Sequence, residues 1–471
     1  MVFNSLTFVL FFAAVLVLHR LPLSWTLRKG NLLIASYLFY AAWNPPFVVL
    51  LWISTITDWF VARGLANARS RRRRRALLGV SLGVNLGLLG YFKYAGFLLE
   101  NFVALAGSLG IDFEPAAPDI ILPLGISFYT FQTLSYTISV YRRESAPSRS
   151  FLDYALYVTF FPQLVAGPIV RATDFLPQCE EPKRANARQL GWGATLLLFG
   201  LFQKMVLADA LFAPIADLVF AAPARAGTLG AWVGAFAFSG QIFFDFAGYS
   251  SCAIGTALCL GFVLPENFRC PYGSLGFSDF WRRWHVSLSS WLRDYLYISI
   301  GGNRAATWRV AANLMFTMLV GGLWHGASWH FVVWGGLHGL YLVLERALRR
   351  LTGDLAATRG TALRLAVALA TFVVVSLTWI FFRAPSLGAA TLLATNLVSG
   401  AASPLVPWSL VPWVGVPMLL TFALHWTLRD ADLEMRFSSL ALPWRAALLA
   451  GLVLSILFAP GDDRAFIYFQ F

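Results

Sequence analysis

The sequence is poor in charged residues, and this scarcity argues against an ordinary soluble protein. Only 13% of its 471 residues are charged, about half the usual share, whereas 58% are hydrophobic and the mean hydropathy is +0.66. So many apolar residues cannot all be buried in the cores of soluble domains. Many separated apolar runs approach the ~20 residues that cross a bilayer, so the sequence predicts an all-α, polytopic transmembrane helical bundle.

Cysteine is also scarce, which argues against a disulfide framework or a zinc site. The four cysteines are Cys179, Cys252, Cys259 and Cys270. None forms a CxxC pair, and the second and third lie in apolar sequence. We expect the cysteines to be small packing residues.

The N-terminal segment lacks the features of a signal peptide. MVFNSLTFVLFFAAVLVLHR has no positively charged start and no small-x-small cleavage site, so we interpret it as a retained first span. The net charge of +13 could indicate nucleic acid as a partner. The basic residues, however, fall in short clusters between apolar spans, where orientation signals and contacts with membrane lipids belong. We therefore expect no binding to nucleic acid.

Two basic clusters flank an apolar hairpin near the N-terminus. Arg20, Arg28 and Lys29 precede the hairpin, and the run RSRRRRR from Arg69 follows it. Because Lys and Arg favour the cytoplasmic side, both clusters are predicted to be cytoplasmic and the N-terminus to lie outside. The NPP sequence at 44–46 marks the turn of the hairpin.

Further apolar segments predict the remaining spans. The segment 76–97 should cross the membrane and lead into an acidic outer loop. The segment 151–170 contains two prolines and a glycine, so it could be a broken or re-entrant helix as easily as a full span. Clearer spans are predicted at 189–206, 228–248, 310–325, 328–345, 364–382, 411–428 and 444–459. Hydropathy predicts about eleven crossings in all.

The central segment 265–309 is unlike its surroundings. It interleaves Arg, Asp, Glu and Trp, so it is too polar to cross lipid alone and too aromatic for a plain loop. This composition favours a helix that lies at the membrane interface or dips into the bundle. Its excess of Arg favours the cytoplasmic side.

Four of the six histidines, at positions 285, 325, 330 and 338, fall in and just after this segment. No HExxH motif or nearby carboxylate set accompanies them, and three ligands would not converge from one helix, so we expect no metal site. His19 and His425 lie near the ends of apolar spans and should sit at the interface.

The histidines of the apolar run differ in their surroundings. His330 suits a structural role, with its imidazole donating to a backbone carbonyl, and His338 is left undecided. His325 is flanked by glycines, which let the backbone pack closely or bend. Ionisable residues within membranes are functional candidates, and neutral imidazole is the usual general base. The residues alone do not decide whether His325 has a catalytic or a structural role.

Two stretches with these histidines resemble a known family. WRRWHVSLSSWLRDYLYISIGGNR and GGLWHGASWHFVVWGGLHG resemble motifs of the membrane-bound O-acyltransferase (MBOAT) family, and more narrowly its alginate O-acetylation branch. Supporting motifs occur in order along most of the chain: SYLFYAAWNP from Ser36, FKYAGF from Phe92, LPLGISFYTFQTLSY from Leu122, FFPQLVAGPIVR from Phe160, FFDFAGYS from Phe243, LPENFRCPY from Leu264 and the terminal FIYFQF.

The resemblance implies one MBOAT domain over residues 1–471, a helical bundle around a central tunnel. It also implies that His325, in the WHG-type motif, transfers an acyl group to a hydroxyl, with His285 of RRWH as a second functional histidine. In the polysaccharide branch, acetyl from cytosolic acetyl-CoA is passed across the bacterial inner membrane toward a periplasmic polysaccharide acetyltransferase. The sequence departs from the family at Ser139, where an acid is usual, and at Ser299, where proline is common. The first departure puts an ion pair at that site in doubt.

The mechanism that we expect uses His325 as general base, kept neutral by its apolar surroundings. It requires no metal or bound cofactor, because the thioester supplies its own leaving group. Four arginines could hold the CoA phosphates or simply mark the cytoplasmic side: Arg282, Arg283, Arg293 and Arg304. Trp324, Asp245 and His338 should line the tunnel or be structural.

Other functions are compatible with the same sequence. Within the family they are O-acetylation of peptidoglycan or cellulose and transfer of D-alanine to teichoic acid. A non-enzymatic transporter or channel would also need buried polar residues, but it would leave acetyl-CoA intact.

Overall fold

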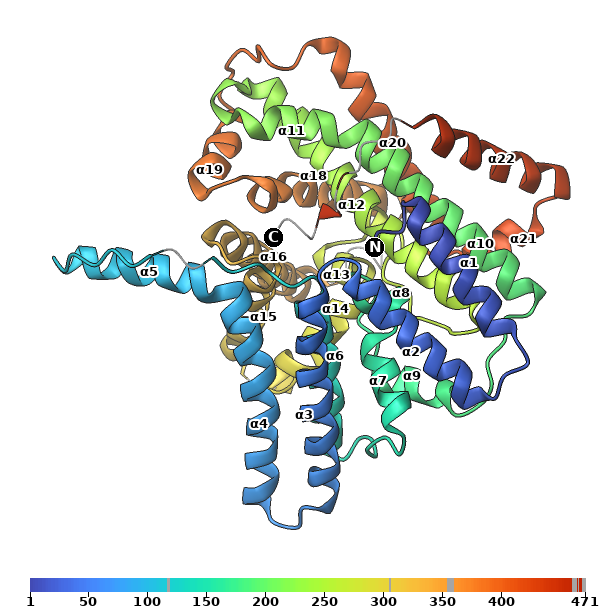
Figure 1. Ribbon diagram of the computed structural model, residues 1–471. Coiled ribbons are helices and arrows are strands. Elements are labelled where there is room, and N and C mark those ends of the chain that lie inside the picture. The colour runs from blue at the N-terminus through green and yellow to red at the C-terminus, as the bar shows by residue number, and fades with distance from the viewer. Residues whose placement is uncertain (117–118, 305, 354–359, 460–463, 465, 468–471) are drawn as a thin grey trace. The chain divides into compact units, whose positions relative to one another are not determined.

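The computed structural model describes the chain apart from residues 117–118, 305, 354–359, 460–463, 465 and 468–471, and helices make up its regular structure (Figure 1). Most of the terminal FIYFQF motif, from position 468 on, lies outside the described residues. The chain divides into two compact units, one of residues 1–194 with 253–265 and the other of 195–252 with 266–471.

The first unit is built from helices of very different lengths. They are α1 (Leu6–Arg20), α2 (Trp25–Ala41), η1 (Pro45–Phe47), α3 (Val48–Asn67), α4 (Arg71–Leu89), η2 (Gly90–Tyr94), α5 (Ala95–Ser108), α6 (Ile126–Arg142), α7 (Phe151–Thr159), α8 (Phe161–Leu164), α9 (Ala172–Phe175), η3 (Leu176–Cys179), the first half of α10 (Ala187–Leu201) and the end of α12 (Gly227–Cys259).

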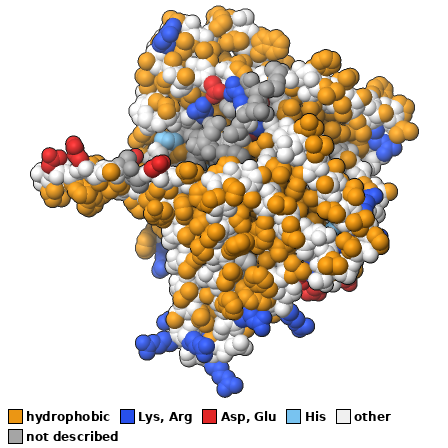
Figure 2. Space-filling model, viewed as in Figure 1, with side chains coloured by type: hydrophobic (Ala, Val, Ile, Leu, Met, Phe, Trp, Pro, Cys, Tyr) orange, Lys and Arg blue, Asp and Glu red, His pale blue; other side chains and the backbone are white. Residues whose placement is uncertain are grey.

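The predicted turn at 44–46 is confirmed, although α2 is shorter than a full span. Asn44 leaves α2 with extended backbone, and two prolines then begin the short 3-10 turn η1 that leads into α3. Figure 2 shows apolar side chains over the exposed faces of α3 and α4 and Lys and Arg side chains where these two helices join. Large apolar side chains such as Trp52, Phe60 and Val80 are exposed there, as expected for helices that face lipid.

Two local features of this unit concern the predicted spans. The predicted end near residue 97 is wrong, because the π-helical turn η2 carries α4 directly into α5, and the helical segment runs on to Ser108. Of the alternatives left open for 151–170, the structure has the broken helix, because Phe160, with a ψ of 111°, separates α7 from α8. Phe160 and Phe161 are fully buried, which satisfies the rule that irregular backbone at membrane depth lies inside protein.

A buried acid that the sequence analysis did not single out joins three helices of the first unit. Asp58 of α3 accepts hydrogen bonds from Ser81 and from Asn85 Nδ2 (2.7 Å) of α4 and from Thr137 Oγ1 (3.0 Å) of α6. Polar side chains of this kind fasten helices together where apolar burial alone does not distinguish protein from lipid.

The second unit contains the central histidines. Its helices are the second half of α10, η4 (Phe202–Phe212), α11 (Ala213–Ala221), η5 (Pro223–Arg225), most of α12, η6 (Pro271–Gly273), α13 (Phe277–Arg283), α14 (Val286–Trp291), η7 (Leu292–Tyr297), η8 (Gly302–Arg304), α15 (Thr307–His325), α16 (Trp329–Thr352), α18 (Thr361–Arg383), α19 (Leu387–Asn396), η9 (Trp408–Leu410), α20 (Val411–Leu428), α21 (Leu433–Ser439) and α22 (Leu442–Phe458).

Glycines bring α15 and α16 into backbone contact. A Cβ atom at Gly322 would lie 2.2 Å from the carbonyl oxygen of Phe331, and one at Gly335 would lie 2.3 Å from that of Met318. Small residues allow helices to approach this closely within a membrane. The crossing fixes the end of α15, where His325 lies.

The number of spans differs from the prediction. Seven described helices are long and apolar enough to cross a membrane, or eight if the bent pair α21 and α22 forms one span. The expected count of about eleven is not confirmed. The difference arises partly because α1 and α2 have only 15 and 17 residues and because 151–170 is broken into short pieces. The chain is nevertheless a multi-pass membrane protein.

The segment 265–309 forms short helical pieces rather than one interfacial helix. Positive φ angles at Cys270, Gly276 and His285 interrupt the helical path. Phe280 and Trp284 are fully buried in the apolar core of the second unit. The segment therefore contributes aromatic side chains to that core.

Two of the cysteines are confirmed as packing residues. A Cβ atom at Gly200 would lie 2.7 Å from the sulfur of Cys252, and one at Gly193 would lie 2.7 Å from that of Cys259. Each cysteine of α12 thus fills the space left by a glycine of α10. All four cysteines are free thiols.

Candidate active site

His325 is the last residue of α15, and its side chain is only 3% exposed. The chain leaves the helix through Gly326 in an extended conformation, and α16 begins at Trp329. A Cβ atom at Gly326 would lie 2.0 Å from the ring of Phe331. Only glycine fits after His325, so the sharp exit from α15 and the place of the imidazole are fixed together.

Three aromatic rings enclose the imidazole of His325. The ring centroids of Trp324, Trp334 and Phe382 lie 5.0, 5.1 and 5.2 Å from it, each at a steep angle of 69–88°. These rings come from α15, α16 and α18. Edge-to-face contacts of this kind restrict rotation of the imidazole and keep water from its faces.

His285 lies between α13 and α14 with a left-handed backbone conformation, φ 43° and ψ 54°. This conformation costs a non-glycine residue about 1–3 kcal/mol. Hydrogen bonds with Asn267 offset the cost. The backbone carbonyl oxygen of Asn267 accepts from the N–H of Val286, and the Asn267 side chain contacts both His285 and Ser287. The His285 side chain is fully buried.

The contacts of Asn267 determine the tautomer of His285. Asn267 Oδ1 accepts from the backbone N–H of Ser287 (3.3 Å), which shows that this atom is the amide oxygen. His285 Nδ1 lies 3.0 Å from the same oxygen and must therefore carry the proton that it donates. Burial lowers the pKa of His285 to about 3, so the imidazole is neutral near pH 7 and its basic nitrogen is Nε2.

The two predicted catalytic histidines both contact the indole ring of Trp324. The ring of Trp324 lies 5.0 Å from that of His325 and 6.0 Å from that of His285. Trp324 is thus the residue through which these distant segments of the sequence meet.

The other two histidines of this region have different surroundings. His330 Nδ1 donates to the carbonyl oxygen of Phe381 (2.9 Å), which confirms the structural hydrogen bond that we predicted for it. His338 is fully buried against Trp334 and Trp281, at 4.8 and 5.1 Å between ring centroids. Within the described part of the chain, neither ring nitrogen of His338 has a hydrogen-bond partner.

The remaining two histidines lie in different units and are less exposed than an interfacial position suggests. His19 of the first unit is buried. His425 of α20 is half-buried, and its Nδ1 accepts from the backbone N–H of Tyr272 (3.2 Å).

Asp245 of α12 has the partner that its burial requires. Lys204 of η4 lies 2.7 Å from one carboxylate oxygen of Asp245 and 2.9 Å from Asp209. The backbone N–H of Ile467 donates to the other oxygen of Asp245 (2.6 Å). All three ionisable side chains are buried, so the cation between two acids is a structural centre of the second unit.

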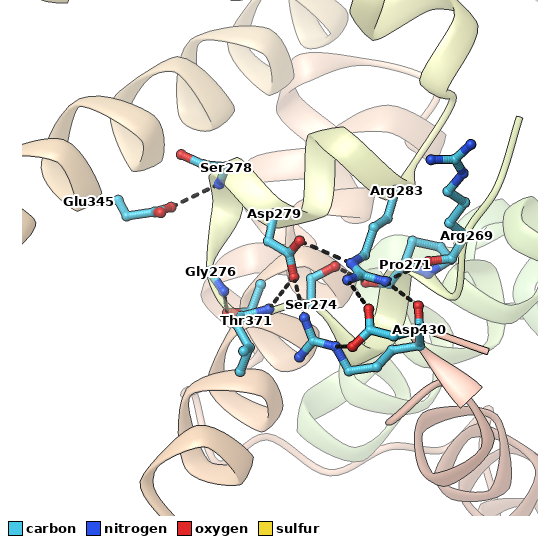
Figure 3. A network of polar contacts seen from close by, with 12 residues as sticks. Arg269, Pro271, Ser274, Gly276, Ser278, Asp279, Arg283, Glu345, Thr371 and Asp430 are labelled. Carbon is cyan, nitrogen blue, oxygen red and sulfur yellow. Dashed lines mark hydrogen bonds and ion pairs between the residues drawn. The ribbon is translucent and has the colours of Figure 1, made fainter. Parts of the chain in front are cut away.

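The four arginines that could hold the CoA phosphates differ in their burial and partners. Arg283 belongs to a polar network in which it contacts Asp279 (3.0 Å) and Asp430 (2.9 Å), and the network ties α13 to the end of α20 (Figure 3). Arg293 is exposed and pairs with the adjacent Asp294 at 2.7 Å. Arg282 and Arg304 are also exposed, and neither side chain has a hydrogen bond or ion pair within the described residues.

The described residues contain no group of three or more His, Cys, Asp and Glu side chains placed to share a metal ion. The site therefore consists of two buried imidazoles, one of them neutral with a basic Nε2, among aromatic side chains. An imidazole can accept the proton of a hydroxyl nucleophile. Fold and site together define a multi-pass membrane protein with an imidazole suited to group transfer.

The comparison with known proteins gives the family. The family model of the membrane-bound O-acyltransferases matches residues 142–382, which include all the central histidines. The chain belongs to this family and is an acyltransferase of the O-acetyltransferase type.

Known relatives align with more than half of the chain. It is 44% identical to a probable alginate O-acetylase of Azotobacter vinelandii over 83% of this chain and 76% of that protein. It is 38% identical to a peptidoglycan O-acetyltransferase of Helicobacter pylori over 78% of this chain and 73% of the relative. A teichoic acid D-alanyltransferase of Lacticaseibacillus rhamnosus is 30% identical over 59% of this chain and 75% of the relative.

Proposed function

We propose that this protein takes acetyl from cytosolic acetyl-CoA and passes it across the bacterial inner membrane for O-acetylation of an exported polysaccharide such as alginate. A periplasmic polysaccharide acetyltransferase would complete the modification. The observation that carries the proposal is the 44% identity, over most of both chains, to a probable alginate O-acetylase.

The other reactions of the family have weaker support. Identity to the peptidoglycan relative is 38%, the low end of the 38–44% range of the alginate relatives, and identity to the D-alanyl relative is 30% over a smaller share of the chain. No observation favours cellulose as the polymer. Peptidoglycan O-acetylation is therefore the second candidate.

The proposed reaction uses His325 as its base. A hydroxyl oxygen attacks the thioester carbonyl while the imidazole of His325 takes the hydroxyl proton. The new C–O bond forms, the C–S bond breaks, and the leaving thiolate takes the proton back from the imidazolium. The aromatic rings around His325 support this role, because they would exclude the water that competes with the hydroxyl for the thioester.

His285 is suited to a second, auxiliary role in this scheme. Its Nδ1–H is fixed on Asn267, so Nε2 is the nitrogen through which it would orient the donor or receive a proton. Because burial lowers the pKa of His285 to about 3, its imidazole is a weak base, which favours orienting the donor over receiving a proton.

The arginines should divide into donor-binding and structural residues. Arg282→Gln or Arg304→Gln should raise the KM for acetyl-CoA about 10- to 100-fold, because a charge-assisted hydrogen bond to phosphate contributes ~1.5–3 kcal/mol. Arg283→Gln should instead lower the melting temperature, since it breaks the network with Asp279 and Asp430. Steady-state kinetics and thermal unfolding of the three variants check this, and an unchanged KM for both exposed variants would assign them to membrane orientation alone.

The polymer is tested by deletion of the gene in the organism that carries it. The exported polysaccharides and the peptidoglycan are purified from deletion and parent strains, and their alkali-labile acetyl and D-alanyl esters are measured. Loss of O-acetyl from an exported polysaccharide alone is the expected result. Loss from peptidoglycan, or of D-alanine, would assign the enzyme to the corresponding relative's reaction.

A further inference from the structure

The last described residues of the chain are buried in the second unit. Phe466 and Ile467 are each only 2% exposed, although they follow the apolar helix α22, most of whose side chains are exposed. They lie outside the 142–382 region that the family model matches. Their burial therefore indicates that this part of the chain is packed for a reason that the family match does not give.

Polar contacts fix the backbone and one side chain of this segment. The N–H of Ile467 donates to Asp245, the acid that Lys204 also holds. Arg464 pairs with Asp217 of α11 at 2.5 Å, and Asp217 also pairs with Arg383 at the end of α18 at 2.8 Å. A hydrogen bond to a carboxylate and an ion pair thus hold the segment against α12 and α11.

The aromatic contacts run from Phe466 to a catalytic candidate. Asp245, which binds Ile467, is followed on α12 by Phe246, whose ring lies 5.6 Å from that of Phe466. The ring of Phe246 then meets the imidazole of His285 at 4.6 Å and 86°. Phe466 also packs on Tyr249, one turn further along α12, at 4.8 Å.

The ring of Phe246 therefore has His285 and Phe466 among its neighbours, and His285 has Asn267 on one edge. In a close-packed interior, removing part of Phe466 leaves space into which Phe246 can shift. A shifted Phe246 would no longer hold the imidazole of His285 against Asn267 in one orientation.

We infer that Phe466 is a positioning residue for the acyl-transfer site, which it serves by holding Phe246 against His285. The inference rests on the proposed role of His285. It makes the C-terminal segment part of the active-site structure, beyond the region that the family model matches.

The test compares two phenylalanines with similar burial. Phe466→Leu should lower kcat about 10-fold or more, with KM for acetyl-CoA unchanged, because small displacements of catalytic groups have large effects on rate. Phe212→Leu is the matched control, since Phe212 is fully buried in the same unit and stacks on Phe244 rather than on a histidine neighbour. Phe466→Tyr, which keeps the ring, should restore most of the rate.

Thermal unfolding of the full-length proteins in detergent accompanies the kinetics. The expected result is that Phe466→Leu and Phe212→Leu lower the melting temperature equally, whereas only Phe466→Leu lowers kcat. Equal losses of kcat in both leucine variants, or a wild-type kcat for Phe466→Leu, would overturn the inference. His285→Gln is measured in parallel, and a wild-type rate for that variant would instead overturn the role of His285 in the proposed function.

Discussion

His325→Ala is expected to lower the rate of acetyl transfer by about 10²–10⁴-fold, the usual contribution of a general base. The imidazole lies at the fixed end of α15, where Gly326 admits no side chain and three aromatic rings restrict its orientation. The three rings packed on it belong to Trp and Phe, which are not bases. The measurement is turnover of acetyl-CoA in membranes with equal amounts of wild-type and variant protein.

His330→Ala is the matched control for this prediction. His330 is a neighbouring buried histidine, but its Nδ1 is committed to the carbonyl oxygen of Phe381. Its loss should reduce stability by the ~0.5–1.5 kcal/mol of one hydrogen bond while turnover per folded molecule is retained. Equal losses of turnover in the two variants would show that His325 acts through packing and not through proton transfer.

Lys204→Met is expected to destabilise the protein by about 3–5 kcal/mol, the usual cost of removing one partner from a buried ion pair. The variant leaves Asp209 and Asp245 buried without the cation that lies between them. It also weakens the site to which Ile467 N is bound. Thermal unfolding of the purified protein in detergent and its level in the membrane measure the effect.

Neutral replacement of the whole triad separates charge from packing. Lys204→Met combined with Asp209→Asn and Asp245→Asn removes all three charges and should recover much of the lost stability, because no unpaired charge stays buried. A wild-type melting temperature for Lys204→Met alone, or no recovery in the triple variant, would contradict the assignment of the triad as an ionic centre.

Features that depend on apolar runs and on glycine or proline could be predicted from the sequence. The hairpin turn at Pro45, the break at Phe160 and the helices α15, α16 and α18 follow from such patterns, because lipid forces backbone groups to pair within each helix. Hydropathy alone does not give the length of an individual helix. For that reason α4 continues into α5 against expectation, and α1 and α2 are shorter than full spans.

Features that depend on which distant residues meet could not be predicted. The motifs indicated His285 and His325, but only the fold shows that both contact Trp324. Arg283 has the same sequence environment as Arg282, yet the end of α20 supplies Asp430 to one of them. The roles of Lys204 and Phe466 could not be predicted because Asp245 and Phe246, which they contact, lie on α12.

The most direct test of the central claim uses inside-out membrane vesicles and acetyl-CoA labelled on its acetyl group. Wild-type protein should release free CoA thiol and form alkali-labile labelled ester on the lumenal side, and His325→Ala should do neither at a comparable rate. Thiol release and ester formation by His325→Ala at the wild-type rate would contradict the assignment of this imidazole as the base of the transfer.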